Sequence, residues 1–171
     1  MKLFIASDIH GDFDAASRLV AAYRESGAEK LVLLGDVLYH GPRNDLPRDY
    51  APKEVIAMLN AMKDEILCVR GNCDADVDQL VLNFPILAES SFLATEDLTI
   101  FATHGHNYGP DKLPPMSAGD LLISGHIHIP VCREQDGVWL LNPGSVSIPK
   151  DGSHSCMVYE NGEFRTCILE A

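Results

Sequence analysis

Five short motifs in the sequence carry side chains that can bind metal ions, and each follows a segment predicted to be a β-strand. The side chains offer carboxylate, imidazole or amide oxygen donors, and they are Asp8, His10, Asp36, Asn72, His104, His106, His126 and His128. Such donors suit borderline-hard divalent ions such as Mn²⁺, Fe²⁺ or Zn²⁺. A lone Asp-x-His motif is common in proteins that bind no metal, whereas five such motifs at strand ends are hard to attribute to chance. The pattern therefore predicts a metal centre.

The spacing within the motifs gives a geometric reason for this prediction. In an extended segment, residues i and i+2 point to the same side, so the Asp-x-His motif at 8–10 and the His-x-His motif at 126–128 can each aim two ligands at one point. Without His106 there are seven ligands, which is too many for one tetrahedral site. If Asp36 bridges, each of two metals receives four protein ligands, with room for a shared hydroxide and a phosphate. Glycines beside the ligands permit tight turns and close approach to an anion; they are Gly11, Gly35, Gly71, Gly105 and Gly125.

The first half of the chain alternates between strand-like and helix-like segments. Residues 2–6, 31–34 and 66–70 are rich in β-formers, and each is followed by a polar turn that contains glycine. Residues 13–26 and 53–62 place apolar side chains at helical spacing. This alternation predicts a parallel sheet of βαβ units, in which function gathers at the loops that leave the carboxyl ends of the strands.

The second half of the chain reads mostly as antiparallel strands, which are expected at 91–95, 98–103, 120–124, 130–135, 138–141, 155–160 and 163–169. The dipeptides Asp136-Gly137 and Asn161-Gly162 separate strand-like runs, which is a strong hairpin signal. We therefore expect two sheets packed face to face with helices outside, in a single domain that spans residues 1–171.

Composition limits the classes of partner. The formal net charge of −12 argues against a nucleic-acid surface, but two bound divalent cations would add about +4 to one cleft and make it attractive to a small phosphate. No apolar run approaches the roughly 20 residues of a membrane-spanning helix, so no membrane partner is expected. The N-terminal segment lacks the long apolar region and cleavage site of a signal peptide, which predicts a cytoplasmic protein.

The five cysteines, at positions 68, 73, 132, 156 and 167, show no C-x-x-C pairing. This spacing favours neither a zinc ribbon nor a disulfide framework. Four of them lie in strand-like runs and are expected to be small buried hydrophobes. Cys73 differs because it lies in a turn, where a nucleophile, a metal ligand or half of a disulfide would each be conceivable.

Read in order, the motifs resemble the signature of the calcineurin-like metallophosphoesterases, which is D-x-H, G-D, G-N-[HC]-[DE], H-G and G-H-x-H. The chain carries these blocks at 8–10, 35–36, 71–74, 104–105 and 125–128, followed by Asn-Pro-Gly-Ser at 142–145. Residues 38–52 resemble more narrowly a group of bacterial phosphodiesterases within the family.

The resemblance implies an α/β fold, namely a four-layer α/β/β/α sandwich of two mixed sheets with flanking helices. It also implies a binuclear site in which Asp36 bridges two divalent ions. By motif position, Asp8, His10 and His128 would hold the first ion, and Asn72, His104 and His126 the second. The metal implied by the bacterial group is Mn²⁺, although the ligand set alone would also accept Zn²⁺ or Fe²⁺.

The expected activity is hydrolysis of a small phosphodiester. Two metals about 3.5–4 Å apart would share a water and lower its pKa from about 15.7 toward ~7, and the resulting hydroxide would attack phosphorus in line. Asn72, Cys73 and His104 are the expected catalytic residues, and Cys73, Arg43 and His106 the expected substrate contacts. Arg43 has a plainer interpretation as a solvated arginine or part of a subunit contact, and His106 as a residue that only borders the cleft.

Cys73 departs from many relatives, which carry histidine there to protonate the leaving oxygen or steady the phosphate. Since a thiol is a weaker donor, the sequence predicts good activity on diesters with acidic leaving groups and poor activity on alkyl ones. The neighbouring Asp74 could orient a ligand or residue 73, or it could cap the segment that follows.

Two other functions stay open at this point. The scaffold subunit of the eukaryotic retromer complex resembles this fold yet acts mainly in protein interaction, although such scaffolds tend to lose ligand histidines that this chain retains. A phosphomonoesterase or protein phosphatase is the second alternative, and it would be distinguished by the ratio of diester to monoester hydrolysis. A homo-oligomer is plausible for the family.

Overall fold

The computed structural model describes residues 1–94 and 99–170 and arranges them as two five-stranded sheets with two α-helices. The helices are α1 (Phe13–Ser26) and α2 (Pro52–Asn60), and two short 3₁₀ turns follow, η1 (Lys63–Glu65) and η2 (Asp78–Leu80). The prediction of two helices is confirmed, with the second ending two residues early. No described helix is long and apolar enough to span a bilayer.

The first sheet has the strand order β10-β9-β1-β2-β3. Its strands are β1 (Lys2–Ala6), β2 (Lys30–Leu33), β3 (Ile66–Cys68), β9 (Ser155–Glu160) and β10 (Glu163–Ile168). Strands β1, β2 and β3 are parallel, as the βαβ pattern predicted, while the β9–β10 hairpin is antiparallel and joins this sheet beside β1. The carboxyl ends of the three parallel strands therefore meet at one edge.

The second sheet has the strand order β4-β5-β6-β8-β7. Its strands are β4 (Ser90–Ala94), β5 (Thr99–Thr103), β6 (Leu121–Ile123), β7 (Pro130–Gln135) and β8 (Val138–Pro143). The outer pairs β4–β5 and β7–β8 are antiparallel, but β5, β6 and β8 are parallel to one another. The family resemblance implied such a mixed sheet, whereas the strand pattern alone indicated mostly antiparallel strands. The expected strand ends at residues 95 and 98 lie outside the described residues.

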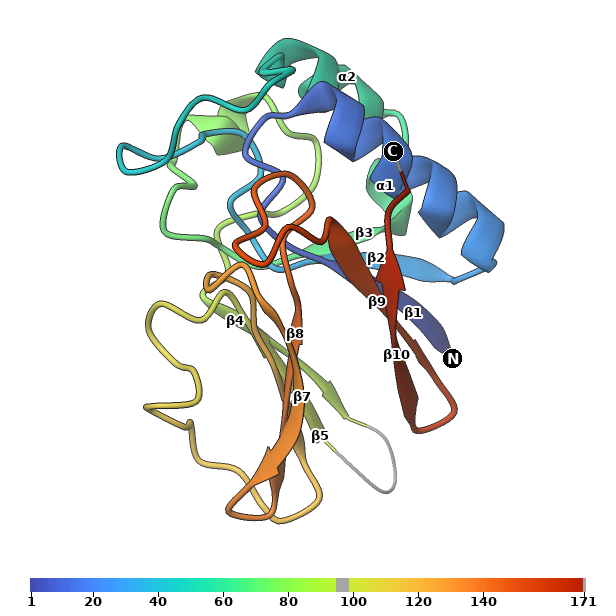
Figure 1. Cartoon of the computed structure of the whole chain (residues 1–171), viewed down its shortest axis with the longest axis vertical. Helices are drawn as coiled ribbons and strands as arrows, with labels where there is room; N and C mark the ends of the chain where they lie inside the picture. The colour runs from blue at the N-terminus through green and yellow to red at the C-terminus, as the bar shows by residue number, and fades with distance from the viewer. Residues whose placement is uncertain (95–98, 171) are drawn as a thin grey trace.

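The two sheets pack face to face, and strand β1 shows how the sequence produces this. Alternate residues Leu3 and Ile5 face the second sheet and join a buried cluster with Ile100 and Ile123, whereas Phe4 faces the opposite way and packs in the cluster that holds α1 and α2. Both faces of β1 are apolar because both are covered, as expected for a central parallel strand. Figure 1 shows the two helices on the outer face of the first sheet.

The outer layer over the second sheet is built differently. The face formed by Phe101, Leu122 and Leu140 is covered by Leu113 and Met116. These two residues belong to segment 104–120, all of which is described and which contains no helix. The predicted α/β class with two mixed sheets and flanking helices is confirmed, and an irregular segment forms the layer on this side.

Candidate metal centre

The seven predicted ligands leave the carboxyl ends of five parallel strands, three in the first sheet and two in the second. Asp8 and His10 follow β1, Asp36 follows β2 and Asn72 follows β3. In the second sheet, His104 follows β5, and His126 and His128 follow β6. The structure brings all seven side chains together at the edge where these strand ends meet.

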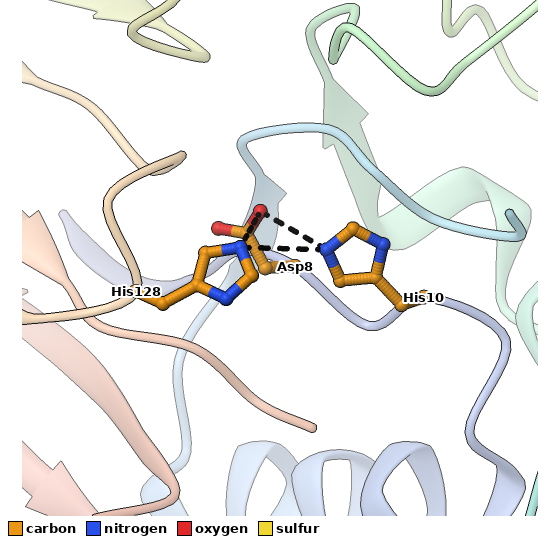
Figure 2. Close-up of side chains that lie close together, drawn as sticks. All are labelled: Asp8, His10 and His128. Atoms are coloured by element: carbon orange, nitrogen blue, oxygen red, sulfur yellow. Dashed lines mark hydrogen bonds and ion pairs between the residues drawn. The ribbon is translucent and has the colours of Figure 1, made fainter. Parts of the chain in front are cut away.

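The first group of side chains comprises Asp8, His10 and His128, which point toward one another in Figure 2. Asp8 Oδ1 lies 3.1 Å from His128 Nε2 and 3.5 Å from His10 Nε2, and the two Nε2 atoms are 3.5 Å apart. All three residues are buried. Burial alone would raise the pKa of Asp8, but the facing imidazoles of His10 and His128 outweigh it and hold that pKa far below its usual value.

The second group of side chains is centred on His104. Its Nε2 lies 3.0 Å from Asn72 Oδ1, 3.2 Å from His126 Nδ1 and 3.4 Å from Asp36 Oδ2. Asp36 Oδ2 is also 3.8 Å from Nε2 of His10, which belongs to the first group. One carboxylate oxygen therefore faces both groups, as a bridging ligand must.

The donor atoms in this cluster fit cations. Asp8 Oδ1 is buried and has no partner with hydrogen-bond geometry in the described structure. Three imidazoles donate from Nδ1–H to backbone carbonyls: His10 to Tyr39 at 2.7 Å, His104 to Leu34 at 2.7 Å and His128 to Ile148 at 2.8 Å. This hydrogen bond fixes the tautomer and aims the Nε2 lone pair into the cluster, which is the usual arrangement of metal-binding histidines.

Five of the ligands have left-handed backbone conformations. The positive φ angles are 61° at Asp8, 49° at His10, 54° at Asp36, 70° at His126 and 60° at His128. In the rest of the described chain, the non-glycine residues with positive φ are Asp136 and Asn161, which precede glycine in hairpin turns. The expectation that the i and i+2 ligands lie on extended segments is therefore wrong. A left-handed residue costs about 1–2 kcal/mol, and such strain gathers at functional sites.

Hydrogen bonds from the Asn-Pro-Gly-Ser segment hold Asp8 in this conformation. Ser145 Oγ and Ser147 Oγ donate to the Asp8 carbonyl at 3.1 Å and 3.0 Å, and Val146 N donates to the Ser7 carbonyl at 3.0 Å. Gly125 lies so close to Ser7 Oγ that any side chain at position 125 would collide with it. The segment thus stabilises the strained turn rather than contributing a ligand.

Asp74 holds the Asp36 turn against the turn after β3. Its carboxylate accepts hydrogen bonds from the backbone of Asp36 at 2.8 Å, Val37 at 2.9 Å and Gly71 at 2.7 Å. The turn that follows, η2, has no side-chain cap, and its first residue Asp78 accepts from Ala75 N at 2.8 Å. Of the two roles left open from the sequence, the structure favours the orientation of ligand backbone.

Replacing Asp74 with alanine is expected to lower the free energy of unfolding by about 2–4 kcal/mol, because three buried N–H groups lose their acceptor. Urea denaturation of the metal-free protein measures this change. Asp76→Ala is the matched control, since Asp76 is exposed two residues away and should change stability by less than about 0.5 kcal/mol. Equal effects of the two substitutions would contradict this role of Asp74.

Cys73 lies beside Asp36 and is half-buried. Its backbone N–H donates to Asp36 Oδ1 at 2.7 Å, and its Sγ accepts from Asn72 Nδ2 at 3.2 Å. Burial and the Asp36 carboxylate both disfavour the thiolate and raise the pKa of the Cys73 thiol to about 12. These groups of the protein keep the side chain as a thiol, which weakens the interpretation of Cys73 as a nucleophile.

A cavity of about 370 Å³ opens on the ligand cluster, and two of the three expected substrate contacts, Cys73 and Arg43, line it. His106 is exposed and is not part of the lining. The centre of its ring lies 5.4 Å from that of His104. The partial burial of the ring and the nearby His104 both lower the pKa of His106. The lining also includes Asn44 and Lys150, which the sequence analysis missed. No local sequence motif marks Lys150, whose backbone N–H is held by the distant carbonyl of His128 at 3.0 Å.

With this geometry in view, comparison with known proteins identifies the family. Residues 1–162 match the calcineurin-like phosphoesterase superfamily domain. The chain belongs to the calcineurin-like phosphoesterase superfamily. Among its relatives in this superfamily, Phosphodiesterase YfcE of Escherichia coli K12 is 49% identical over 153 residues, which cover 90% of this chain and 83% of YfcE. A phosphodiesterase of Methanocaldococcus jannaschii is 26% identical over 182 residues, which cover 99% of this chain and all of that protein.

Solved structures of superfamily members confirm the fold. A structure described as YfcE, a phosphoesterase from E. coli, superposes with a TM-score of 0.92 at 42% identity, covering 99% of this chain and 100% of that one. Vacuolar protein sorting 29 from Cryptosporidium parvum superposes with a TM-score of 0.60 at 16% identity, covering 98% of this chain and 95% of that one. The second similarity shows the fold alone.

Proposed function

We propose that this chain is a phosphodiesterase that hydrolyses small phosphodiesters with two divalent metal ions. The observation that carries the proposal is the presence of two ligand groups that share one carboxylate oxygen of Asp36, in a chain 49% identical to Phosphodiesterase YfcE. The conserved fold alone would also suit a scaffold such as the vacuolar sorting protein. The complete set of seven ligand side chains supports the enzyme instead.

In this proposal Asp8, His10 and His128 would hold one ion. Asn72, His104 and His126 would hold the other, and Asp36 would serve both. When bound, the ions supply a water of lowered pKa and neutralise charge on the phosphate. The oxygen and nitrogen donors accept Mn²⁺, Zn²⁺ or Fe²⁺. Similarity to YfcE and its relatives favours Mn²⁺ among these ions.

The residues of the chain position the substrate and keep the site in one geometry. The carbonyls of Tyr39, Leu34 and Ile148 hold the imidazole rings of His10, His104 and His128 in the orientation that metal binding needs. A phosphate bound in this cavity would lie among His126, His128 and Asn72, with Cys73 beside them, since all four residues line it. A serine or cysteine nucleophile is not needed, because water attacks phosphorus directly.

Removal of metal tests this function. Protein stripped with EDTA is expected to lose activity on bis-p-nitrophenyl phosphate, and added Mn²⁺ should restore at least about a hundredfold in rate, since metal-assisted steps contribute several kcal/mol. Absence of activity with every divalent metal would support the scaffold. Faster hydrolysis of p-nitrophenyl phosphate than of the diester would support a phosphomonoesterase.

The remaining expectations about surroundings stay predictions. They are a cytoplasmic location, the absence of nucleic-acid and membrane partners, and a homo-oligomer. The net charge of −12 supports the absence of a nucleic-acid partner.

A further inference from the structure

Two cationic side chains from distant parts of the sequence line the cavity at the metal centre. Arg43 lies in the loop after β2, and Lys150 lies in the turn before β9. Five of the other lining residues are Asp36, Asn72, Cys73, His126 and His128, which belong to the ligand cluster or lie beside it. The cavity is therefore lined both by the ligand cluster and by two cationic side chains.

Lys150 is attached to the ligand loop through its backbone. Its N–H donates to the carbonyl of His128 at 3.0 Å, and the His128 ring donates to the carbonyl of Ile148 at 2.8 Å. These two hydrogen bonds tie residues 148–150 to a metal ligand from both sides. The backbone of Lys150, from which its side chain extends, is thus held next to the ligand cluster.

Neither Arg43 nor Lys150 has an acidic partner. No ion pair joins either of them to any residue of 1–94 or 99–170, and both are exposed. Two unpaired cations in one cavity of about 370 Å³ are unusual in a chain with a net charge of −12. Together they provide more positive charge than a diester with one negative charge requires. The two bound metal ions already supply the positive charge for that single phosphate.

A larger cavity of about 1000 Å³ adjoins the first and shares Arg43 and Asn44 with it, but its charge balance is different. Four aspartates line it, at positions 12, 14, 45 and 49, against the arginines at 18, 43 and 48. Arg18 is already paired with Asp14 at 3.1 Å. An anionic group would therefore be favoured in the cavity at the metal centre and not in the larger one.

We propose that Lys150 and Arg43 together select phosphodiesters that carry a second anionic group, a carboxylate or a phosphate, close to the scissile phosphorus. Both residues would contact this second group while the ligand cluster binds the reacting phosphate. The inference rests on the proposed phosphodiesterase function and names its substrate class. Lys150 is thereby a specificity-determining residue that the sequence motifs do not contain.

The test compares two substrates with the same leaving group, the p-nitrophenyl phosphodiesters of 3-hydroxypropanoate and of its methyl ester. These differ by one carboxylate charge. An exposed charge pair is worth up to about 1 kcal/mol, or about fivefold, so two cations should give the carboxylate substrate an advantage of about tenfold in kcat/KM. We expect this ratio to fall to about threefold in Lys150→Met and in Arg43→Met, and to about one in the double variant.

Two control variants separate this local effect from the net charge of the protein. Lys63→Met removes one positive charge at η1, which precedes β3 and thus lies at the opposite edge of the sheet. Arg48→Met removes the positive charge of a residue that lines only the larger cavity. Both variants should keep the tenfold ratio. In the unsubstituted protein the ratio should decline as added salt shortens the screening length.

Direct binding provides a readout that does not depend on turnover. The product 3-phosphonooxypropanoate should raise the melting temperature of the Mn²⁺-loaded protein more than its methyl ester does. Lys150→Met should reduce this difference, and the double variant should remove it. A ratio at or below one in the unsubstituted protein, or a ratio that Lys150→Met leaves at tenfold, would overturn the inference. Failure of the proposed function would be seen separately, as absence of hydrolysis of both substrates and of bis-p-nitrophenyl phosphate.

Discussion

Exchanging Asp36 for asparagine is expected to lower kcat/KM for bis-p-nitrophenyl phosphate at least about a hundredfold and to reduce the metal content from two ions per chain toward one. Substitution of a residue that only orients a metal ligand lowers metal affinity or activity by about 10–100-fold. Loss of a ligand shared by two metals should lower them by at least as much. Kinetics with added Mn²⁺ and metal analysis of the dialysed protein measure the two effects.

The structure explains why this substitution is informative. Asp36 Oδ2 faces His10 and His104 from the two ligand groups, and Oδ1 accepts the Cys73 N–H at 2.7 Å. Burial would raise the pKa of Asp36, but the His104 imidazole outweighs it and lowers that pKa, so the residue is a carboxylate at neutral pH. Asparagine keeps the size and the acceptor for Cys73 but loses the negative charge that two cations would share in the proposed centre.

Asp45→Asn is the matched control because Asp45 is an exposed carboxylate in the neighbouring loop and lines only the larger cavity. It should leave metal content and activity unchanged within about twofold. Circular dichroism and a melting curve establish that Asp36→Asn is folded. A folded Asp36→Asn protein with two metals and full activity would show that Asp36 does not bridge.

The sequence predicted the strands and helices well because their causes are local. Short runs of β-formers, helical spacing of apolar residues and the Asp-Gly and Asn-Gly turns each act within a few residues, and β1, α1 and the β9–β10 hairpin appear as expected. The side chains predicted as ligands lie together for a similar reason, since a motif that follows a strand in a parallel sheet must lie at its carboxyl edge. The family resemblance then supplied the pairing of ligands with metals.

The features that the sequence did not predict depend on contacts between distant segments. Asp8 was expected on an extended segment, but its left-handed conformation is held by Ser145 and Ser147, which lie far along the chain. The outer layer over the second sheet was expected to be helical, but the irregular segment 104–120 covers it with Leu113 and Met116. Lys150 was missed because its place in the cavity follows from a backbone contact that no local pattern encodes.

Exchanging Cys73 for histidine is expected to raise kcat/KM for diesters with alkyl leaving groups by about a hundredfold. The same exchange should change kcat/KM for diesters with aryl leaving groups by less than about threefold. A general acid contributes about 10²–10⁴ when the leaving oxygen needs a proton, and an alkoxide needs one far more than a nitrophenolate does. The Cys73 side chain is shorter than histidine and its thiol is a weak hydrogen-bond donor, so it is a poor match for this role.

The surroundings of Cys73 leave room for the larger side chain on one side only. A Cβ built at Gly41 would come 3.0 Å from Cys73 Sγ, so the loop after β2 closes one side of the thiol. The other side borders the cavity of about 370 Å³, into which an imidazole can extend. The hydrogen bond to Asp36 comes from the backbone of residue 73 and is therefore kept in the variant.

The measurement that checks this expectation is the dependence of kcat/KM on the leaving-group pKa, across a series of phosphodiesters with one constant ester group. Cys73→His should flatten this dependence and add a basic limb to the pH–rate profile. Cys73→Gln, which can donate a hydrogen bond but not transfer a proton, should leave the steep dependence in place. If Cys73→His instead lowered kcat/KM for every substrate by the same factor, the thiol would have another role, such as packing against Gly41 or contacting the phosphate. In that case, a steep dependence of kcat/KM on leaving-group pKa in the native protein would have a cause outside position 73, because a proton donor at that position would not have changed it.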